Sequence, residues 1–401
     1  MSTGPLRWTV LSLVLALPGL FVTPTHAQDA GSGPATVAGP DAPATTPAEA
    51  PVAAAPTGQE LYEEACANCH GPDGTGMSPT TLGFADPAPP DFTDCEFASR
   101  EPHGDFVWVA QEGGPLRGFD RMMPAFGDAL TEEELERVVG YIKSLCTDER
   151  WPQGEFNLPL ALATEKAYPE DEYVFQSTVG TGDAPSVMNN LVYEKRFGAR
   201  NQVEISVPFG WRELSEPQGP NDGDWAGGLG DVAVGLKRVL FHSMGSGTIT
   251  SFTFEAILPT GDESEDFGKG YTVLEPFLTF AQFLPLESFV QMQAGAELPT
   301  DTDFENEGFF RVALGRTFTP GGPWGRAWSP MVEFLASREL EDGASTTWDL
   351  LPQMQVTLNQ RQHIMANFGV RLPLTETEGR DPQLMVYVLW DWFDGGLFEG
   401  W

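Results

Sequence analysis

The stretch EEACANCHGPDGTG, residues 63–76, contains the most specific pattern in this chain of 401 residues. Cys66, Cys69 and His70 have the spacing C-x-x-C-H, which is typical of covalent haem attachment. Two residues between the cysteines allow both thiols to meet one edge of a porphyrin, and the adjacent histidine can then reach the iron. The alternatives are a zinc site and a C-x-x-C redox pair beside an unrelated histidine. We interpret the motif as the attachment site of one covalent haem c.

Residues 1–27 have the organisation of an export signal. Arg7 precedes an apolar run at residues 8–22, and the sequence Thr-His-Ala that follows suits cleavage after Ala27. The run is short for a membrane-spanning helix, so we expect removal rather than anchoring. Residues 28–56 are rich in Ala, Pro, Gly and Thr, a composition that predicts a flexible tether without a packed core.

Residues 57–149 are predicted to form a small all-α domain around the haem motif. Thr57 and Glu60 have the spacing of a capping box, and Thr131 and Glu134 repeat it. Apolar residues recur at helical spacing after the second box, which indicates an amphipathic helix. We expect this last helix to cross the first one and to hold the haem.

The loop between these helices contains RMMPAFG, residues 121–127. Together with CANCHG and a final helix containing YIKSL, it resembles the class I cytochromes c over roughly residues 59–146. In that family the methionine before the proline is the distal iron ligand, which implies that Met123 and His70 are the two protein ligands of the iron. Pro124 biases the preceding residue toward an extended conformation, which helps a loop to present the thioether.

Three other side chains compete for the distal position. Met122 is the main alternative to Met123, followed by Met77 and His103. A thioether opposite an imidazole favours ferrous haem and leaves no open coordination position for a substrate. We therefore assign no catalytic residue and expect an electron carrier rather than a catalyst. A catalytic role, if there were one, would be that of an oxidoreductase.

Cys95 and Cys146 remain after the haem motif has used its two cysteines. In an oxidising compartment two further cysteines in one small domain most often form a disulfide. Such a bond would tie the loop PPDFTDCEF to the end of the last helix. The alternative is two independent thiols.

Residues 173–401 have a different periodicity. In QVEISVPFGW, residues 202–211, apolar side chains occupy the odd-numbered positions, which is the alternation of a two-faced β-strand. About twelve such runs lie between residues 173 and 393, joined by turn-like sequences, and each has nearly the length of a tilted membrane strand. The sequence therefore predicts an antiparallel β-barrel of about twelve strands, preceded by a connector at residues 150–172.

Alternation alone does not distinguish a barrel in lipid from a soluble sandwich or closed barrel. Export, an even strand number, aromatic residues near strand ends, and long acidic connections alternating with short turns favour the outer membrane. The terminal Trp401 is similar to the terminal aromatic residue of outer-membrane proteins. The region resembles outer-membrane β-barrels of the transporter or porin type. Within it, Gly228, Gly230 and Asp231 are similar to a signature of barrels associated with the degradation of aromatic compounds.

The chain is strongly acidic, with 58 Asp and Glu residues against 22 Lys and Arg residues and a formal net charge of -36. Such a negatively charged surface repels the phosphate groups of nucleic acid, which excludes nucleic acid as a natural partner. The sequence contains no nucleotide-binding loop, hydrolytic triad or metalloprotease motif. The partners that we expect are periplasmic redox proteins and outer-membrane lipid.

These observations lead to one main hypothesis, in which an exported cytochrome domain transfers electrons in the periplasm and is anchored by an outer-membrane barrel. A domain of about 90 residues is roughly 30 Å across, which is too large for a lumen of about twelve strands. We therefore expect it outside the lumen. The alternatives are a soluble periplasmic cytochrome subunit of an oxidoreductase with a β-rich docking domain, and extracellular iron or metal oxidation through a porin-cytochrome fusion, which the chain distantly resembles.

Overall fold

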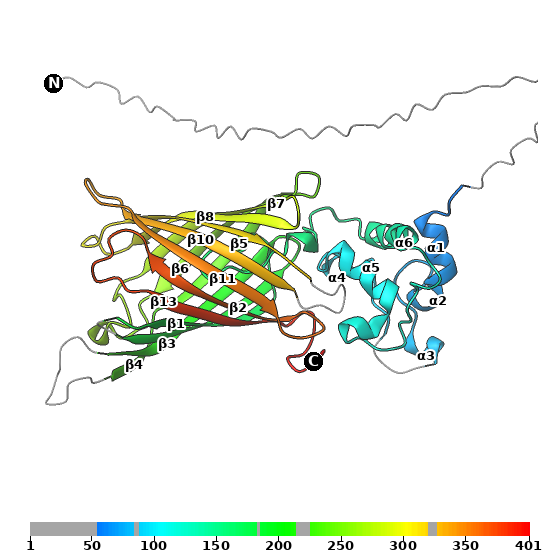
Figure 1. Ribbon diagram of the computed structural model, residues 1–401, viewed down its shortest axis with the longest axis horizontal. Helices are drawn as coiled ribbons and strands as arrows, with labels where there is room; N and C mark the ends of the chain where they lie inside the picture. The colour runs from blue at the N-terminus through cyan, green and yellow to red at the C-terminus, as the bar shows by residue number, and fades with distance from the viewer. Residues whose placement is uncertain (1–53, 84–87, 183–184, 214–224, 320–326) are drawn as a thin grey trace, which may run out of the picture. The chain divides into compact units, whose positions relative to one another are not determined.

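The computed structural model describes residues 54–401, apart from 84–87, 183–184, 214–224 and 320–326. The signal peptide predicted for residues 1–27 lies outside the described residues, as does nearly all of the predicted tether. Residues 55–401 form one compact unit, which consists of a helical domain followed by a closed β-barrel (Figure 1).

The helical domain is built from short helices around a longer last one. Its elements are α1 Gly58–Ala65, α2 Ala67–His70, α3 Pro79–Leu82, α4 Cys95–Ala98, α5 His103–Glu112, the 3-10 helix η1 Gly114–Arg117, and α6 Glu132–Leu145. Both predicted capping boxes are present, at the starts of α1 and α6. The two helices pack against each other through buried apolar side chains, namely Leu61, Tyr62, Val138 and Ile142. The predicted all-α fold is confirmed.

A disulfide closes this domain. It joins Cys95, the first residue of α4, to Cys146, which directly follows α6, with the two Cα atoms 5.0 Å apart. The expected pairing of these two cysteines is therefore confirmed. Cys66 and Cys69 are free thiols.

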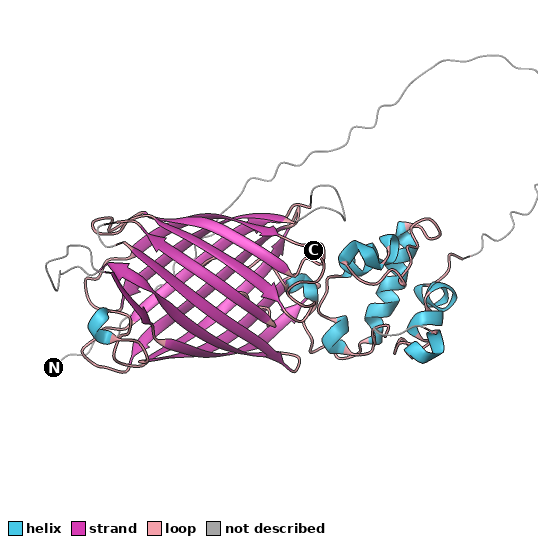
Figure 2. Ribbon diagram, turned by 90° about the horizontal axis from the view of Figure 1, so that it is seen from below, coloured by secondary structure: helices cyan, strands magenta, loops and turns pink. Residues whose placement is uncertain are grey.

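The barrel consists of long antiparallel strands (Figure 2). The strands are β1 Glu172–Gly180, β2 Ser186–Phe197, β3 Asn201–Glu213, β4 Trp225–Leu229, β5 Val232–Ser243, β6 Thr248–Leu258, β7 Val273–Leu284, β8 Ser288–Pro299, β9 Glu307–Arg316, β10 Trp328–Glu339, β11 Thr347–Thr357, β12 Ile364–Pro373 and β13 Gln383–Asp391. Strands next to one another in sequence pair, except that β4 and β5 both pair with β3 instead of with each other. Because β1 pairs with β13 and β2 pairs with β3, the sheet closes.

The number of strands in the closed wall is twelve, because β4 and β5 are two parts of one strand. Both pair with β3 in the same antiparallel direction, and they are separated by Gly230 and Asp231. At this break the Asp231 carboxylate accepts hydrogen bonds from the amides of Gly261 and Lys269, in the loop between β6 and β7. The predicted antiparallel barrel of about twelve strands is confirmed.

The two faces of the wall differ as the alternation predicts. On β6, Ser251 and Thr253 are buried on the inner face, whereas Phe252 and Phe254 are exposed on the outer face. The same contrast recurs on other strands, so the barrel has a polar interior and an apolar exterior. Among the described residues, no helix has both the length and the apolar character needed to cross a membrane.

The two ends of the barrel differ in the length of their connections. Short connections join strands at one end, at residues 198–200, 244–247, 285–287 and 358–363, and 317–327 is the one longer connection there. At the other end 181–185 is short and the others are longer, at 214–224, 259–272, 300–306, 340–346 and 374–382. Glu172 pairs with Asp391, so the start of β1 and the end of β13 both lie at the short-turn end.

The connector predicted for residues 150–172 does more than join the two domains. We call residues 154–170, which begin with the 3-10 helix η2 Gly154–Phe156, the inner segment. Its backbone is hydrogen-bonded to inward side chains of the barrel wall: Gln202, Ser251, Gln291, Gln293, Glu333, Gln353, Asn367 and Tyr387. The segment therefore lies inside the barrel.

The inner segment enters and leaves at the same end. The carbonyl of Arg150 contacts the side chains of Arg200 and His242, 3.2 Å from each, and both lie near short turns. The carbonyl of Asp171 accepts a hydrogen bond from the amide of Trp392, just after β13. The chain thus folds into the lumen as a loop from the short-turn end.

Glu333 on β10 is the principal anchor of this loop. Its fully buried carboxylate accepts hydrogen bonds from the amide of Ala163 and the hydroxyl of Thr164, both on the inner segment, and from the amide group of Gln353. Glu333→Ala would leave these buried donors unpaired, at a cost of about 1–3 kcal/mol each. We expect added protease to cut the inner segment of this variant in detergent. Glu339→Ala, at the exposed end of the same strand, should resist as the unmodified protein does, and equal resistance of both variants would contradict the anchoring role.

Candidate haem site

The C-x-x-C-H motif lies at the junction of the first two helices. Cys66 ends α1, whereas Cys69 and His70 belong to α2. The amide of His70 donates to the carbonyl of Cys66 at 3.0 Å, so the motif forms a single helical turn. Both thiols and the imidazole line one cavity. The structure therefore brings the three residues of the motif to a common space.

His70 has the state that a metal-binding imidazole needs. Its Nδ1 atom is buried and has no hydrogen-bond partner among the described residues, and its ring stacks on Phe92 with 4.8 Å between the ring centroids. Burial lowers the pKa of His70 from 6.5 to about 4. The ring is therefore neutral at physiological pH and keeps a lone pair for a metal.

The thiols and the loop that follows them are fixed by local contacts. Burial, with a smaller contribution from Cys69, raises the pKa of Cys66 to about 11, so this thiol is protonated at neutral pH. The Tyr62 hydroxyl donates to the carbonyl of Gly71 at 2.7 Å and holds the end of α2. Gly76 has a φ of +79°, and a Cβ there would lie 2.5 Å from the backbone oxygen of Pro89. Only glycine fits at this point of the loop.

The walls of the cavity near the motif are largely apolar. They are formed by Phe92, Phe97, Phe106, Leu130, Leu135, Val138, Val139 and Ile142. The apolar walls near the motif, two free thiols on one helical turn and a buried imidazole nitrogen without a partner among the described residues together fit a haem.

Both adjacent methionines lie at this cavity. Met123 is partly buried, and its carbonyl accepts a hydrogen bond from the amide of Gly114 at 3.0 Å. Met122 also lines the cavity but is 52% exposed, and its amide donates to the carboxylate of Asp120. The greater burial of Met123 favours it as the distal ligand, and this assignment stays a prediction.

The two weaker candidates lie elsewhere among the described residues. His103 begins α5, and its Nε2 atom lies 2.7 Å from a carboxylate oxygen of Glu136. The amide of Met77 donates to the carbonyl of Cys69 at 2.9 Å. Neither residue is among the described residues that line the cavity.

Residues 53–142 match a protein family model described as cytochrome c oxidase, cbb3-type, subunit III. The helical domain is a cytochrome c domain. A domain of this kind implies a haem cofactor, in agreement with the cavity and its side chains. The chain therefore combines a cytochrome c domain with a closed antiparallel β-barrel.

Among solved structures, the barrel region is similar to several outer-membrane proteins. The KdgM porin is 10% identical, with coverage of 55% of this chain and 98% of the porin and a TM-score of 0.36. An outer membrane channel from Pseudomonas putida F1 is 12% identical, with coverage of 55% and 93% and a TM-score of 0.38. The NanC porin is 8% identical, with coverage of 54% and 98% and a TM-score of 0.38. No curated protein sequence matches the chain.

The sequence analysis did not identify the acidic side chains inside the barrel. Strand alternation places Glu204 on the polar face of its strand, and the same pattern would place Glu255 on the polar face of β6, but alternation does not bring the two side chains together. Glu165 gave no such signal, since it lies in a segment without strand or helix periodicity. Only the path of that segment through the lumen brings it to the wall.

Proposed function

We propose that this protein is an electron carrier of the outer membrane, with a single haem c bound covalently to Cys66 and Cys69. The observation that carries the proposal is the common cavity of these two thiols, the neutral imidazole of His70 and the thioether of Met123. When bound, the haem would supply a one-electron couple. Because His70 and Met123 would fill both axial positions, the site suits electron transfer rather than substrate activation.

The outer face of the barrel supports a membrane location. Large apolar side chains are exposed there, for example Leu236 at 55%, Phe368 at 54% and Leu278 at 49%. Soluble monomers rarely expose continuous apolar surfaces larger than a few hundred Å². Lipid would cover this surface, whereas a soluble docking domain would leave it in water.

The connections of the barrel support a periplasmic haem domain. Outer-membrane barrels have short turns on the periplasmic side and longer loops outside. Residues 57–149 are joined to the inner segment at the short-turn end, where Arg150 contacts Arg200 and His242. The cytochrome domain would thus face soluble periplasmic redox proteins. The net charge of -36 favours partners with a basic docking face.

Fractionation and protease protection test this arrangement. We expect the haem-stained protein in outer membranes after a carbonate wash, because lipid covers the outer face of the strands. Protease added to intact cells should leave the haem-bearing fragment intact and should release it once the outer membrane is permeabilised. A soluble periplasmic protein serves as the control for membrane integrity.

The two alternatives predict different results in the same experiment. A full-length protein that is freely soluble without detergent would favour the periplasmic oxidoreductase subunit with a β-rich docking domain. Cleavage of the haem-bearing fragment from intact cells would place the haem outside, and would favour extracellular iron or metal oxidation. Either result would contradict the proposed topology.

A further inference from the structure

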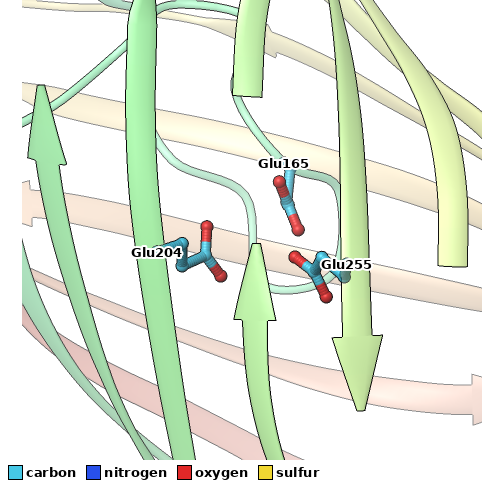
Figure 3. Close-up of side chains that lie close together, drawn as sticks. All are labelled: Glu165, Glu204 and Glu255. Atoms are coloured by element: carbon cyan, nitrogen blue, oxygen red, sulfur yellow. The ribbon is translucent and has the colours of Figure 1, made fainter. Parts of the chain in front are cut away.

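The barrel interior contains an acidic cluster that the haem site does not use. Glu204 lies on β3, Glu255 on β6, and Glu165 on the inner segment. One carboxylate oxygen of each residue lies within 4.8 Å of one oxygen of each of the other two. Figure 3 shows the three carboxylates turned toward one another from different parts of the chain. Their oxygens could therefore contact one ion.

A glycine between the two strands makes room for this arrangement. β5 lies between β3 and β6, and at this level it carries Gly235, which is in register with Glu204 on one side and Glu255 on the other. A Cβ at Gly235 would lie 3.0 Å from the Cγ of Glu255 and 3.5 Å from the Cβ of Glu204. Any larger residue would fill the space between the two glutamates.

Several polar side-chain atoms near this space have no hydrogen-bond partner among the described residues. Glu255 is only 9% exposed, yet its Oε1 atom has no hydrogen-bond partner among the described residues. Gln202 and Thr253, each two residues before a glutamate of the cluster on the same face of its strand, also have buried side-chain atoms without a partner among the described residues. A buried polar group without a partner costs about 1–3 kcal/mol. A bound ligand would remove this cost at Glu255, which is aimed into the cluster.

The local charge points to a cation. The amino group of Lys237 lies 3.6 Å from a carboxylate oxygen of Glu165 and offsets one negative charge. The adjoining strands add Glu194, in register with the glutamate of β3, and Glu275, in register with the glutamate of β6. Two cationic side chains, Lys237 and Arg311, therefore face a row of five carboxylates.

A second acidic group in the barrel shows the contrast. Glu170, Glu172 and Asp391 also lie close enough together to share an ion. There the amino group of Lys166 lies 2.7 Å from carboxylate oxygens of both Glu170 and Glu172. An amino group of the chain itself therefore lies in direct contact with two of these three carboxylates, whereas Lys237 contacts only Glu165 in the other cluster.

We propose that Glu165, Glu204 and Glu255 bind one divalent cation of the class that prefers oxygen ligands, such as Ca²⁺ or Mn²⁺. The cation joins the inner segment to two strands of the wall, and water completes its coordination. Its role is to hold the loop inside the lumen, independently of the haem.

Mn²⁺ alone is the probe for this site. The full-length haem protein is purified in detergent, treated with a chelator, and titrated with Mn²⁺ by calorimetry and by the loss of the free-ion resonance signal. We expect one Mn²⁺ per chain. Glu204→Gln or Glu255→Gln should weaken its binding at least tenfold, because each removes a charged ligand. Glu339→Gln, an exposed acid of the same barrel, should bind as the unmodified protein does.

Gly235→Ala separates the geometry of the site from its charge. This variant keeps every carboxylate but fills the space between Glu204 and Glu255, so we expect a similar weakening. Haem staining and the heat-dependent gel mobility of the barrel verify that each variant is folded. If Gly235→Ala does not fold, the two glutamate variants alone test whether the cluster binds Mn²⁺. Absence of a stoichiometric Mn²⁺ site in the unmodified protein overturns the proposal. Unchanged affinity in both glutamate variants overturns it as well.

Discussion

Replacement of Cys66 or Cys69 by serine is expected to remove most of the haem that survives denaturing electrophoresis. Each thiol would form one thioether bond, and both lie on a single helical turn at the same cavity. A single serine variant keeps only one thiol for attachment, so we expect much less haem to become covalently bound, and the double variant should carry no covalent haem at all. Haem-stained gels measure the loss against the total protein. Retention of full staining in the double variant would contradict attachment through these two thiols.

Cys95→Ser and Cys146→Ser are the matched controls, because their sulfurs form a disulfide and leave the haem motif intact. Both variants should retain haem staining. The cysteines are 51 positions apart, and the chain-entropy model assigns a cross-link of this span about 4 kcal/mol of stability. We expect a decrease of that order in the unfolding free energy of the domain in denaturant. Equal haem loss in all four single variants would show that the two cysteine pairs are not distinct.

Features that depend on local sequence could be predicted well. Thr57 and Thr131 each start a helix, because the capping-box residues are only three positions apart. The alternation on β3 predicted both faces of that strand, because successive side chains in a strand point to opposite faces of the sheet. The closed barrel follows from repetition of this pattern around the sheet. Only the interruption at Gly230 and Asp231 divides one of the twelve strands into two elements.

Features that depend on contacts between distant residues could not be predicted. The inner segment has neither helical nor alternating periodicity, and its place in the lumen is set by side chains far along the chain. Glu333 accepts its hydrogen bond from Ala163 across a sequence separation of 170 residues, and Tyr387 donates to the carbonyl of Leu160 across 227. The acidic cluster depends on the same path, because Glu165 meets the wall only where the segment turns inside the barrel. Local sequence patterns do not predict contacts between residues so far apart in the chain.

The two adjacent methionines mark a limit of a different kind. Two consecutive residues of one loop lie at nearly the same distance from the haem iron, so the sequence alone does not decide whether Met122 or Met123 binds it. The structure adds a difference in exposure, since Met122 is the more exposed of the two. It also ties Met123 to Gly114 through a backbone hydrogen bond.

Met123→Ala is therefore expected to lower the reduction potential of the haem, while Met122→Ala leaves it nearly unchanged. A thioether opposite an imidazole stabilises ferrous iron, and its loss removes that preference. Axial ligation sets haem potentials over a range of about 0.8 V, and we expect a decrease on the order of 0.1 V. A redox titration followed by visible absorption measures the change, and the weak near-infrared iron-sulfur band should vanish only with Met123.

The two variants form a matched pair, because each removes one thioether from the same loop and the same cavity. A loss of potential and of the iron-sulfur band in Met122→Ala, with both retained in Met123→Ala, would assign the distal ligand to Met122. The exposed side chain would then have to turn into the cavity when the haem binds. Retention of the band in both single variants would mean that either methionine can replace the other, and the double variant would then be needed to remove it.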